Sequence, residues 1–265
     1  MNTKETKHIE SNSGSTEPLI EIRRLKKSFG INEVLKGFNL KLFPGENVVI
    51  LGKSGSGKSV LIKCLVRLMQ VDDGEILVLG QHIPNLDQKE LDHIRTEVGF
   101  LFQGSALYDS MTVRENLRFP LRRHPERILG ENEEVLILEA LRNVGLEHAI
   151  DFMPVELSGG MKRRVALART LILKPKIILY DEPTTGLDPI TANEIIQLML
   201  KIQQEFDTAS LIITHDMDCA RVISNRMIIL QDGINYAEGT YTELSKSKDP
   251  KVRAFFKEVQ GRKNG

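Results

Sequence analysis

The fold of this chain is decided by the stretch Gly52-Lys53-Ser54-Gly55-Ser56-Gly57-Lys58-Ser59, which follows the apolar run Val48-Val49-Ile50-Leu51. It matches G-x-x-x-x-G-K-[ST], a phosphate-binding loop in which glycines let successive backbone N–H groups point at phosphates. In this pattern Lys58 supplies positive charge for the β- and γ-phosphates, and Ser59 offers its hydroxyl to Mg²⁺. A helical period of apolar residues continues to about Met69, as the motif requires. We therefore expect a nucleotide site here.

Composition favours one large domain, or a domain with a subdomain. The chain has 265 residues, 41% of them hydrophobic, which is enough for a sizeable core. Lys plus Arg and Asp plus Glu both total 36, so no net charge attracts nucleic acid. There is no signal-peptide core and no apolar stretch that could cross a bilayer, so we expect a soluble cytoplasmic protein. Cys64 and Cys219 lack metal or redox spacing and are expected to pack as small apolar side chains.

The N-terminal region predicts a polar tail followed by a small antiparallel sheet. Residues 1–17 are polar and unpatterned, so we expect them to be disordered. Apolar and polar residues alternate from Leu19 to Leu25 and again from Phe38 to Leu42, with a turn at Phe29-Gly30 between them. The Phe29 ring is expected either in the core or as a stacking surface for a nucleotide base, and the residues alone leave these two alternatives even.

Strand and helix signals alternate through the rest of the chain, which predicts an α/β fold with a mostly parallel sheet. The expected strands are 75–80, 98–102, 176–180, 209–213, and a closing pair at 226–231 and 234–238. The expected helices begin at the N-cap Ser158 and at about Pro189, and they run through Leu171 and Phe206. Residues from about 112 to 150 have helix-period apolar positions and no strand signal, which indicates a mostly helical insertion.

Four of the apolar runs end at residues that suit phosphoryl transfer. These are the 52–59 loop, Gln103, Asp181-Glu182 and His215. Ligands bind beyond the carboxyl ends of parallel strands, so we expect one site built from all four. Asp181 is expected to hold Mg²⁺, and Glu182 to orient and deprotonate the attacking water. Gln103 is expected to contact the metal or the water, and His215 to hydrogen-bond the γ-phosphate.

A second helix start, Leu157-Ser158-Gly159-Gly160, also has the residues of an anion site, although the phosphate loop already supplies one. Lys162-Arg163-Arg164 follow in the first turn, where the helix dipole prefers acidic side chains. Such a local conflict often marks function. For the three charges themselves, however, we expect a solvated basic face.

Taken together, these motifs resemble the ATP-binding-cassette (ABC) ATPases from about Leu19 to Leu244. The corresponding segments are Gly52 to Ser59 for Walker A, Gln103 for the Q-loop, Leu157 to Gly160 for the signature, Ile177 to Glu182 for Walker B, Gly186-Leu187-Asp188 for the D-loop and His215 for the switch histidine. The resemblance implies a homodimer paired head to tail, in which the signature of one copy caps the γ-phosphate on the Walker A of the other. It also implies that Phe29 stacks on adenine.

The resemblance implies the fold and the site residues as well. The fold would be an ABC-type nucleotide-binding domain with a RecA-like mostly parallel sheet, a small antiparallel β subdomain and a helical subdomain at about 104–160. This domain would cover 18–256 and be followed by a tail at 257–265, leaving no room for a regulatory domain of sugar-importer type. The cofactors would be ATP and Mg²⁺. The implied residues are Glu182, His215 and Gln103 for catalysis, Ser59, Gln103 and Asp181 for the metal, and Phe29, Gly52, Lys53, Ser54, Gly55, Ser56, Gly57, Lys58, Ser59, Val60, Ser158, Gly159, Gly160 and Asp188 for the nucleotide.

Within the family, the segments from Leu101 to Asn116 and Phe119-Pro120-Leu121 resemble the ATPase of Mla-type, MCE-associated phospholipid transporters. Residues 157–164, 188–191 and 249–256 agree with that subgroup. The resemblance implies a peripheral protein on the cytoplasmic face of the inner membrane, partnered by an MlaE-like permease, an MCE-domain protein and a small STAS-domain subunit, with no nucleic acid. Lys53 stands where general cassettes often carry Pro, and we have no explanation for it.

Three alternatives stay open. The chain could power another transporter, such as an amino-acid importer, act on ribosomes or DNA, or bind nucleotide while hydrolysing little. The absence of a coiled-coil insertion or basic surface argues against the second alternative, and Glu182 argues against the third. For a transporter, we expect Leu107, Tyr108 and Met111 to line a groove for a permease helix, with core packing as the alternative for Leu107.

Overall fold

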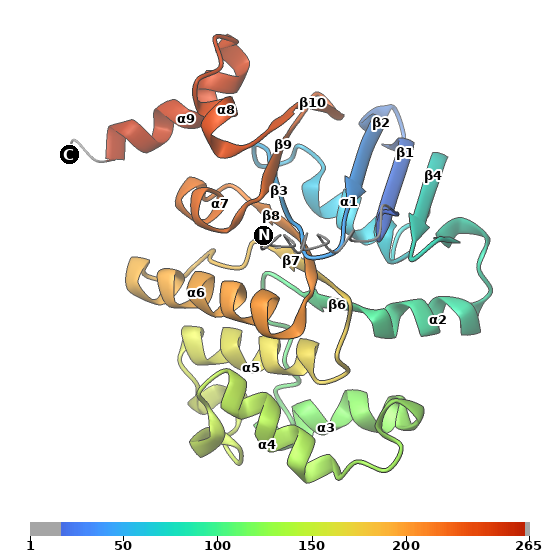
Figure 1. Ribbon diagram of the computed structural model, residues 1–265, viewed down its shortest axis with the longest axis vertical. Coiled ribbons are helices and arrows are strands. Elements are labelled where there is room, and N and C mark those ends of the chain that lie inside the picture. Colours follow the sequence, from blue (N-terminus) through green and yellow to red (C-terminus); the bar gives the residue numbers. More distant parts are fainter. Residues whose placement is uncertain (1–16, 263–265) are drawn as a thin grey trace, which may run out of the picture.

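A six-stranded sheet lies at the centre of the molecule, and its strand order places the four predicted strand ends side by side (Figure 1). The computed structural model describes residues 17–262, so the expected tail at 1–17 lies, apart from residue 17, outside the described residues. The sheet order is β10 (Ile234–Gly239), β9 (Arg226–Gln231), β3 (Asn47–Leu51), β8 (Ala209–Thr214), β7 (Ile177–Asp181) and β6 (Val98–Leu101). All neighbours are parallel except the β9–β10 pair, which is antiparallel. The expected mostly parallel sheet is therefore confirmed.

The inner strands of this sheet are buried on both faces, which is why they read as continuous apolar runs rather than alternating ones. In β3, Val48 and Ile50 belong to one core, whereas Val49 and Leu51 belong to the core on the opposite face. This follows from the two-residue period of a strand. The strand is thereby held from both sides directly before the phosphate loop begins.

The first core is covered by a second, antiparallel sheet and two helices, as Figure 1 shows at its right. This sheet has the order β2 (Asn32–Leu42), β1 (Ile20–Phe29), β4 (Asp73–Val78) and β5 (Gln81–His82). The helices are α1 (Lys58–Leu65) and α2 (Gln88–Glu97). The predicted antiparallel β subdomain is confirmed, although α1 ends at Leu65 rather than near Met69, and α2 and β5 were not predicted.

Helices cover the opposite face of the central sheet. They are α5 (Gly159–Leu171), α6 (Pro189–Phe206), α7 (Met217–Ile223), α8 (Tyr241–Ser245) and α9 (Pro250–Arg262). The expected tail at 257–265 is corrected in part, because the α9 backbone stays helical to Arg262. Val252 and Phe256 of α9 are buried in the same core as Leu244 of α8, and this packing fixes the first turns of α9.

The third core belongs to the helical region, where α3 (Val113–Arg123) and α4 (Glu133–Asn143) pack against α5 (Figure 1). This confirms the predicted helical insertion. Its core extends along α5 to Ile172, beyond the expected boundary at 160, because one face of α5 packs on the insertion while Ala166, Leu167 and Leu171 pack on the central sheet. Between residues 17 and 262, none of the helices is long and apolar enough to cross a membrane.

Candidate nucleotide site

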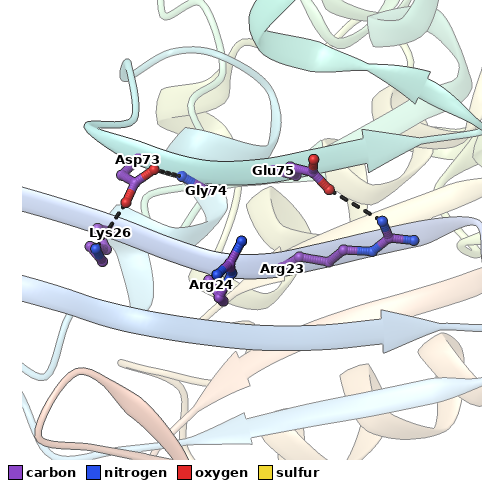
Figure 2. A pocket seen from close by; sticks show the side chains of 6 residues that line it. All are labelled: Arg23, Arg24, Lys26, Asp73, Gly74 and Glu75. Atoms are coloured by element: carbon purple, nitrogen blue, oxygen red, sulfur yellow. Dashed lines mark hydrogen bonds and ion pairs between the residues drawn. The ribbon is translucent and has the colours of Figure 1, made fainter.

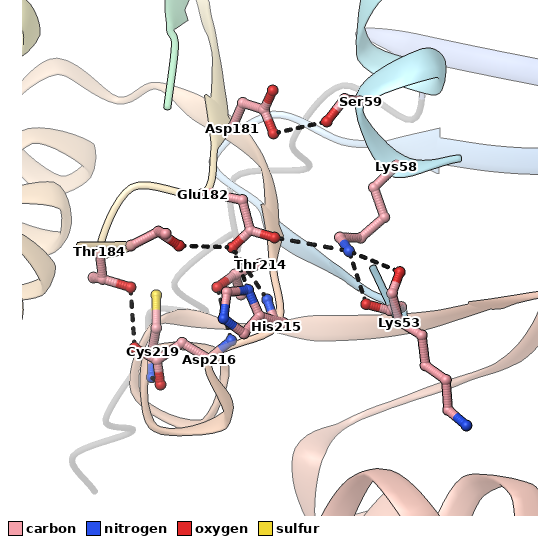
Figure 3. A network of polar contacts seen from close by, with 12 residues as sticks. Lys53, Lys58, Ser59, Asp181, Glu182, Thr184, Thr214, His215, Asp216 and Cys219 are labelled. Atoms are coloured by element: carbon pink, nitrogen blue, oxygen red, sulfur yellow. Dashed lines mark hydrogen bonds and ion pairs between the residues drawn. The ribbon is translucent and has the colours of Figure 1, made fainter. Parts of the chain in front are cut away.

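The strand register brings the phosphate loop, Asp181-Glu182 and His215 to one edge of the central sheet. Leu51 pairs with Thr214, and Asp181 pairs with Ile213, so the residues after β3, β7 and β8 emerge at the same level. Figure 3 shows the result: the side chains of Lys58, Glu182 and His215 converge, while Ser59 faces Asp181 beside them. The expected meeting of these three segments is confirmed.

The loop before α1 has the backbone that a phosphate cradle needs. Gly55 and Gly57 have φ angles of 80° and 99°, in the region that favours glycine. A Cβ on Gly57 would lie 2.6 Å from Val34 Cγ1, and one on Gly52 would lie 2.4 Å from Ser56 Oγ. The loop therefore fits against β2 and closes on itself only with glycine at these positions. The hydroxyl of Ser56 is buried and has no hydrogen-bond partner among the described residues, so it suits a phosphate oxygen.

Lys58 lies inside this loop and is buried. Its Nζ donates to the backbone oxygens of Gly52 at 2.7 Å and Lys53 at 3.3 Å, and it lies 3.7 Å from Glu182 Oε1. Burial lowers the pKa of Lys58 below its ordinary value, while Glu182 and Asp181 oppose that shift. A cation held by carbonyls in a half-closed loop attracts the charge of a phosphate strongly, because little water screens it.

Ser59 and Asp181 make the pair expected at a metal site. The Ser59 hydroxyl donates to Asp181 Oδ1 at 3.3 Å, and Asp181 is only 7% exposed. Burial raises the pKa of Asp181 above its ordinary value, against the hydrogen bond from Ser59. A hydroxyl and a carboxylate oxygen beside a phosphate loop are hard oxygen ligands of the kind that Mg²⁺ prefers, so the residues fit this metal.

Glu182 is held by several donors and sits in a strained backbone. Its φ angle is 51°, in the left-handed region that is uncommon for a residue with a side chain. Its Oε2 contacts His215 Nδ1 at 2.8 Å and accepts from Thr185 Oγ1 at 3.2 Å and from the His215 backbone N–H at 3.3 Å. The carboxylate is thus fixed at the strand end, with Lys58 on its other oxygen. Sequence reasoning missed Thr185, although its position three residues after Glu182 was a usable signal.

A cavity of about 360 Å³ lies beside the phosphate loop. Loop residues 53–56 form one wall, and β2, the β9–β10 turn and α9 form the others. Val34, Asp232 and Phe255 line it. Val34 had no sequence signal, whereas Asp232 lies between the two expected closing strands and Phe255 lies in the 249–256 segment that resembles the lipid-transport subgroup. Phe29 is not among its lining residues; it ends β1, is 48% exposed and has Lys27 Nζ 5.6 Å from its ring centroid. Lys53 lines this cavity, and in Figure 3 its side chain points away from Glu182.

Other predicted residues stand apart from this network. Gln103, two residues beyond β6, is exposed and makes no side-chain hydrogen bond within the described chain. Ser158 caps α5 by accepting from Met161 N–H at 3.2 Å, and Asp188 caps α6 by accepting from Ile190 and Thr191 N–H. A Cβ on Gly160 would lie 2.5 Å from Thr191 Cγ2, so this glycine lets α5 and α6 approach closely. Val60 is half-buried in α1.

Two expectations about side chains were tested directly. Cys64 and Cys219 are buried in the cores, which confirms their packing role; burial raises the pKa of Cys64 to about 11. The expected solvated face at residues 162–164 is wrong for Arg163, which is 4% exposed. Arg163 lies four residues before the buried Leu167 and so shares the inward face of α5. Arg164 is ion-paired with Glu194 at 2.6 Å.

The antiparallel sheet carries a separate hollow of about 450 Å³ between β1 and β4 (Figure 2). Its charges largely neutralise one another, because Arg23 pairs with Glu75 at 3.3 Å and Lys26 with Asp73 at 2.9 Å. Asp73 also accepts from the Gly74 N–H. None of its lining residues belongs to the strand ends described above, so the chemistry resides at the central sheet.

Comparison with known proteins agrees with this site. The family model described as "ABC transporter" matches residues 35–185. A probable ribonucleotide transport ATP-binding protein of Mycobacterium leprae is 40% identical over 93% of this chain and 70% of its own length. The intermembrane phospholipid transport ATP-binding protein MlaF of Haemophilus influenzae is 37% identical over 90% of each chain. The methionine import ATP-binding protein MetN of Campylobacter jejuni is 36% identical over 91% of this chain and 76% of its own length.

A solved structure supports the same conclusion. A dimeric ATP-binding cassette in a post-hydrolysis state, bound to ADP and Pi, is 34% identical, covers 83% of this chain and 98% of its own chain, and has a TM-score of 0.75. The matched family segment runs from β2 through the Walker B region and contains the phosphate loop, Asp181 and Glu182. This chain therefore belongs to the ABC transporter family, as an ATP-binding subunit whose ATPase activity is coupled to transport.

Proposed function

We propose that this chain powers phospholipid transport between the inner and outer membranes, from a peripheral position on the cytoplasmic face of the inner membrane. Two findings support this cargo. The segment from Leu101 to Asn116 resembles the Mla-type ATPases, and the chain is similar to MlaF along 90% of each sequence. Its membrane partner would be an MlaE-like permease, with an MCE-domain protein and a small STAS-domain subunit in the same complex.

The observation that carries the hydrolytic role is the convergence of Lys58, Glu182 and His215 at the strand ends, with Ser59 and Asp181 beside them. Lys58 and the loop N–H groups would bind the β- and γ-phosphates of ATP. The Ser59 hydroxyl and the Asp181 carboxylate would hold Mg²⁺, with Gln103 contributing when its segment closes. Mg²⁺, when bound, neutralises phosphate charge.

Glu182 would orient the attacking water and accept its proton, because its carboxylate already lies beside the phosphate-binding lysine. His215 would keep Glu182 oriented through its Nδ1 contact of 2.8 Å and would reach the γ-phosphate with the other ring nitrogen. Thr185, three residues further along the same loop after β7, donates to the same carboxylate oxygen. The strained φ of Glu182 is consistent with a position kept for chemistry rather than for stability.

Two copies of the chain would form the working site as a homodimer. Ser158, Gly159 and Gly160 would cap the γ-phosphate bound to the other copy, with Asp188 at the shared interface and Phe29 stacking on adenine. Ser158 and Gly159 are exposed and make no hydrogen bond with the phosphate loop of their own chain within residues 17–262, which supports a partner-supplied role. The dimeric cassette with ADP and Pi supports the same arrangement.

Glu182→Gln tests the hydrolytic assignment. The surface change Glu205→Gln is the matched control, since among the described residues Glu205 pairs only with Lys201, also on α6, at 3.6 Å. Removing the base should lower ATP turnover by about 10²-fold or more while ATP affinity changes little. A variant that hydrolyses ATP normally, or that loses ATP affinity in proportion to turnover, would show that the role assigned to Glu182 is wrong.

The similarity to the methionine import protein favours a second candidate cargo, an amino acid such as methionine. The two possibilities separate in proteoliposomes that contain the chain and its co-purified membrane partners. ATP-dependent transfer of labelled phospholipid to acceptor membranes supports the proposal. ATP-dependent uptake of labelled methionine, with no lipid transfer, supports the amino-acid importer instead.

A further inference from the structure

Arg163 is a buried guanidinium without a carboxylate partner. It is 4% exposed, and no Asp or Glu of the described chain lies within ion-pair distance of it. Burial lowers its pKa below the ordinary value, and its Nε has no hydrogen-bond partner among residues 17–262. Taking a charge out of water without a counter-charge destabilises a fold, and an apolar side chain of similar size is commonly neutral or stabilising in such a place. Arg163 therefore weakens the fold, which points to another role.

The donors of Arg163 reach two segments of the nucleotide site. Nη1 donates to the backbone oxygen of Phe102 at 2.8 Å, directly before Gln103. Nη2 donates to the backbone oxygen of Thr185 at 3.5 Å, and the hydroxyl of Thr185 holds Glu182. One side chain in the signature helix α5 thus joins the backbone beside Gln103 to the backbone beside the catalytic carboxylate.

A second arginine of α5 holds the far end of the same segment. Arg169 donates to the backbone oxygen of Ser105 at 3.2 Å and to Asn116 Oδ1 at 3.4 Å. Ser105 and Ala106 have φ angles of 62° and 49°, in the left-handed region. The backbone is therefore strained at the residue that Arg169 contacts and at the one after it. Contacts with α5 therefore help to hold the segment after β6 in this shape.

We propose that Arg163 is a positioning residue for ATP hydrolysis, which aligns the segment bearing Gln103 with the loop that orients Glu182 and ties both to the signature helix. This inference rests on the proposed roles of Gln103 and Glu182. It assigns a task to a side chain that lies outside the motifs that bind nucleotide. A misplacement of about 1 Å at such residues is enough to lower a rate by about 10²-fold.

The test compares R163M, R163K and the neighbouring control R164M in the full-length chain. R163M removes the buried charge at similar length, and R163K keeps the charge with a single donor group. R164M removes the partly exposed Glu194 pair and a 3.4 Å hydrogen bond to the Val144 backbone oxygen, neither of which involves the nucleotide site. We expect R163M to lower kcat by about tenfold or more with KM changed less than about threefold, R163K to recover part of the rate, and R164M to match the parent. The melting temperature of R163M should equal or exceed that of the parent.

A cycle with Q103A separates positioning from general damage. If Arg163 acts through the Gln103 segment, the double variant R163M/Q103A loses less than the product of the two single losses. Three results would overturn the proposal. They are a loss of kcat in the double variant equal to the product of the two single losses, an unchanged kcat in R163M, and a melting temperature of R163M more than about 5 °C below that of the parent. Normal turnover in Glu182→Gln would instead overturn the proposed site roles, so the two failures are distinguishable.

Discussion

At the scale of single residues, the site gives up stability for function. Asp181 and Lys58 are buried charged groups whose pKa values are shifted against their charged forms, chiefly by burial. Glu182 adds a left-handed backbone conformation. A fold selected only for stability would avoid each of these features, so their presence at one edge of the sheet identifies the site independently of any motif.

Asp181→Asn should therefore stabilise the nucleotide-free chain while abolishing its metal-dependent nucleotide binding. The cost of the ionised carboxylate is full above the raised folded-state pKa and disappears below the unfolded value of 3.8. The variant should gain about 1 kcal/mol near neutral pH, or roughly 2–4 °C in Tm, and the gain should shrink as the pH falls towards that value. Thermal unfolding of both proteins between pH 4 and about 8 measures this. A variant less stable than the parent at neutral pH would contradict the buried-charge explanation.

At the scale of secondary-structure elements, β7, α6, β8, β9 and β10 were predictable to within one residue. Their apolar runs are bounded by strong signals, such as Asp188-Pro189 at the start of α6. The helix α2 was missed because only Leu91 and Ile94 of its ten residues are buried large apolar side chains. Its capping box, Asp87 with Glu90, was the signal that could have found it.

Parts of the site could not be read from the sequence for a physical reason. The phosphate loop, Asp181, Glu182 and His215 follow strands, and strand ends of a parallel sheet meet by topology. Val34 lines the neighbouring cavity through tertiary packing that leaves no local pattern, whereas Thr185, three residues after Glu182, could have been found from its spacing. Arg163 was mistaken for a solvated charge because three adjacent basic residues look alike, although only one of them faces inward.

The segment between Gln103 and α3 is the element that we expect to receive a permease. Asn116 is fully buried and binds the backbone of Tyr108 and Met111, so this loop has a fixed shape. Tyr108 is 43% exposed, and its ring centroid lies 4.9 Å from that of Phe119, while Leu107 packs against two cores. Tyr108 therefore offers exposed apolar surface, the half-buried Met111 offers part of its side chain, and Leu107 serves mainly in packing.

Tyr108→Glu and Met111→Glu should uncouple the complex, because a charge in an apolar contact with a permease helix has a high desolvation cost. We expect about tenfold or greater loss of ATP-driven lipid transfer in proteoliposomes, with the fold and ATP binding of the isolated chain retained. Leu129→Glu, at an 83% exposed position of the helical region, is the matched control. Normal transport by both variants would show that the permease docks elsewhere.

At the scale of the whole molecule, the two segments that we propose to share one nucleotide lie apart within a single chain. The phosphate loop and Glu182 lie at the strand ends of the central sheet, whereas Ser158-Gly159-Gly160 begins α5 and makes no hydrogen bond with that loop in the described part of the chain. If the signature acts on nucleotide, it acts on the nucleotide of another copy. Gly159 allows a direct test, because its φ is unstrained and a Cβ there would meet only Leu187 Cδ2, at 3.6 Å.

The most direct measurement is whether dimers formed from two different variants retain ATP. Both variants carry E182Q, so that bound ATP is not hydrolysed. The first parent variant also carries K58A and lacks a working phosphate loop. The second also carries G159D and lacks a working signature, and the room around Gly159 gives this substitution no steric reason to unfold the chain. Mixed, they form one intact composite site from the phosphate loop of one and the signature of the other. We predict that neither parent retains labelled ATP through gel filtration and that the mixture does, at up to about one ATP per heterodimer. Retention by the G159D parent alone, or no retention by the mixture, would contradict the account.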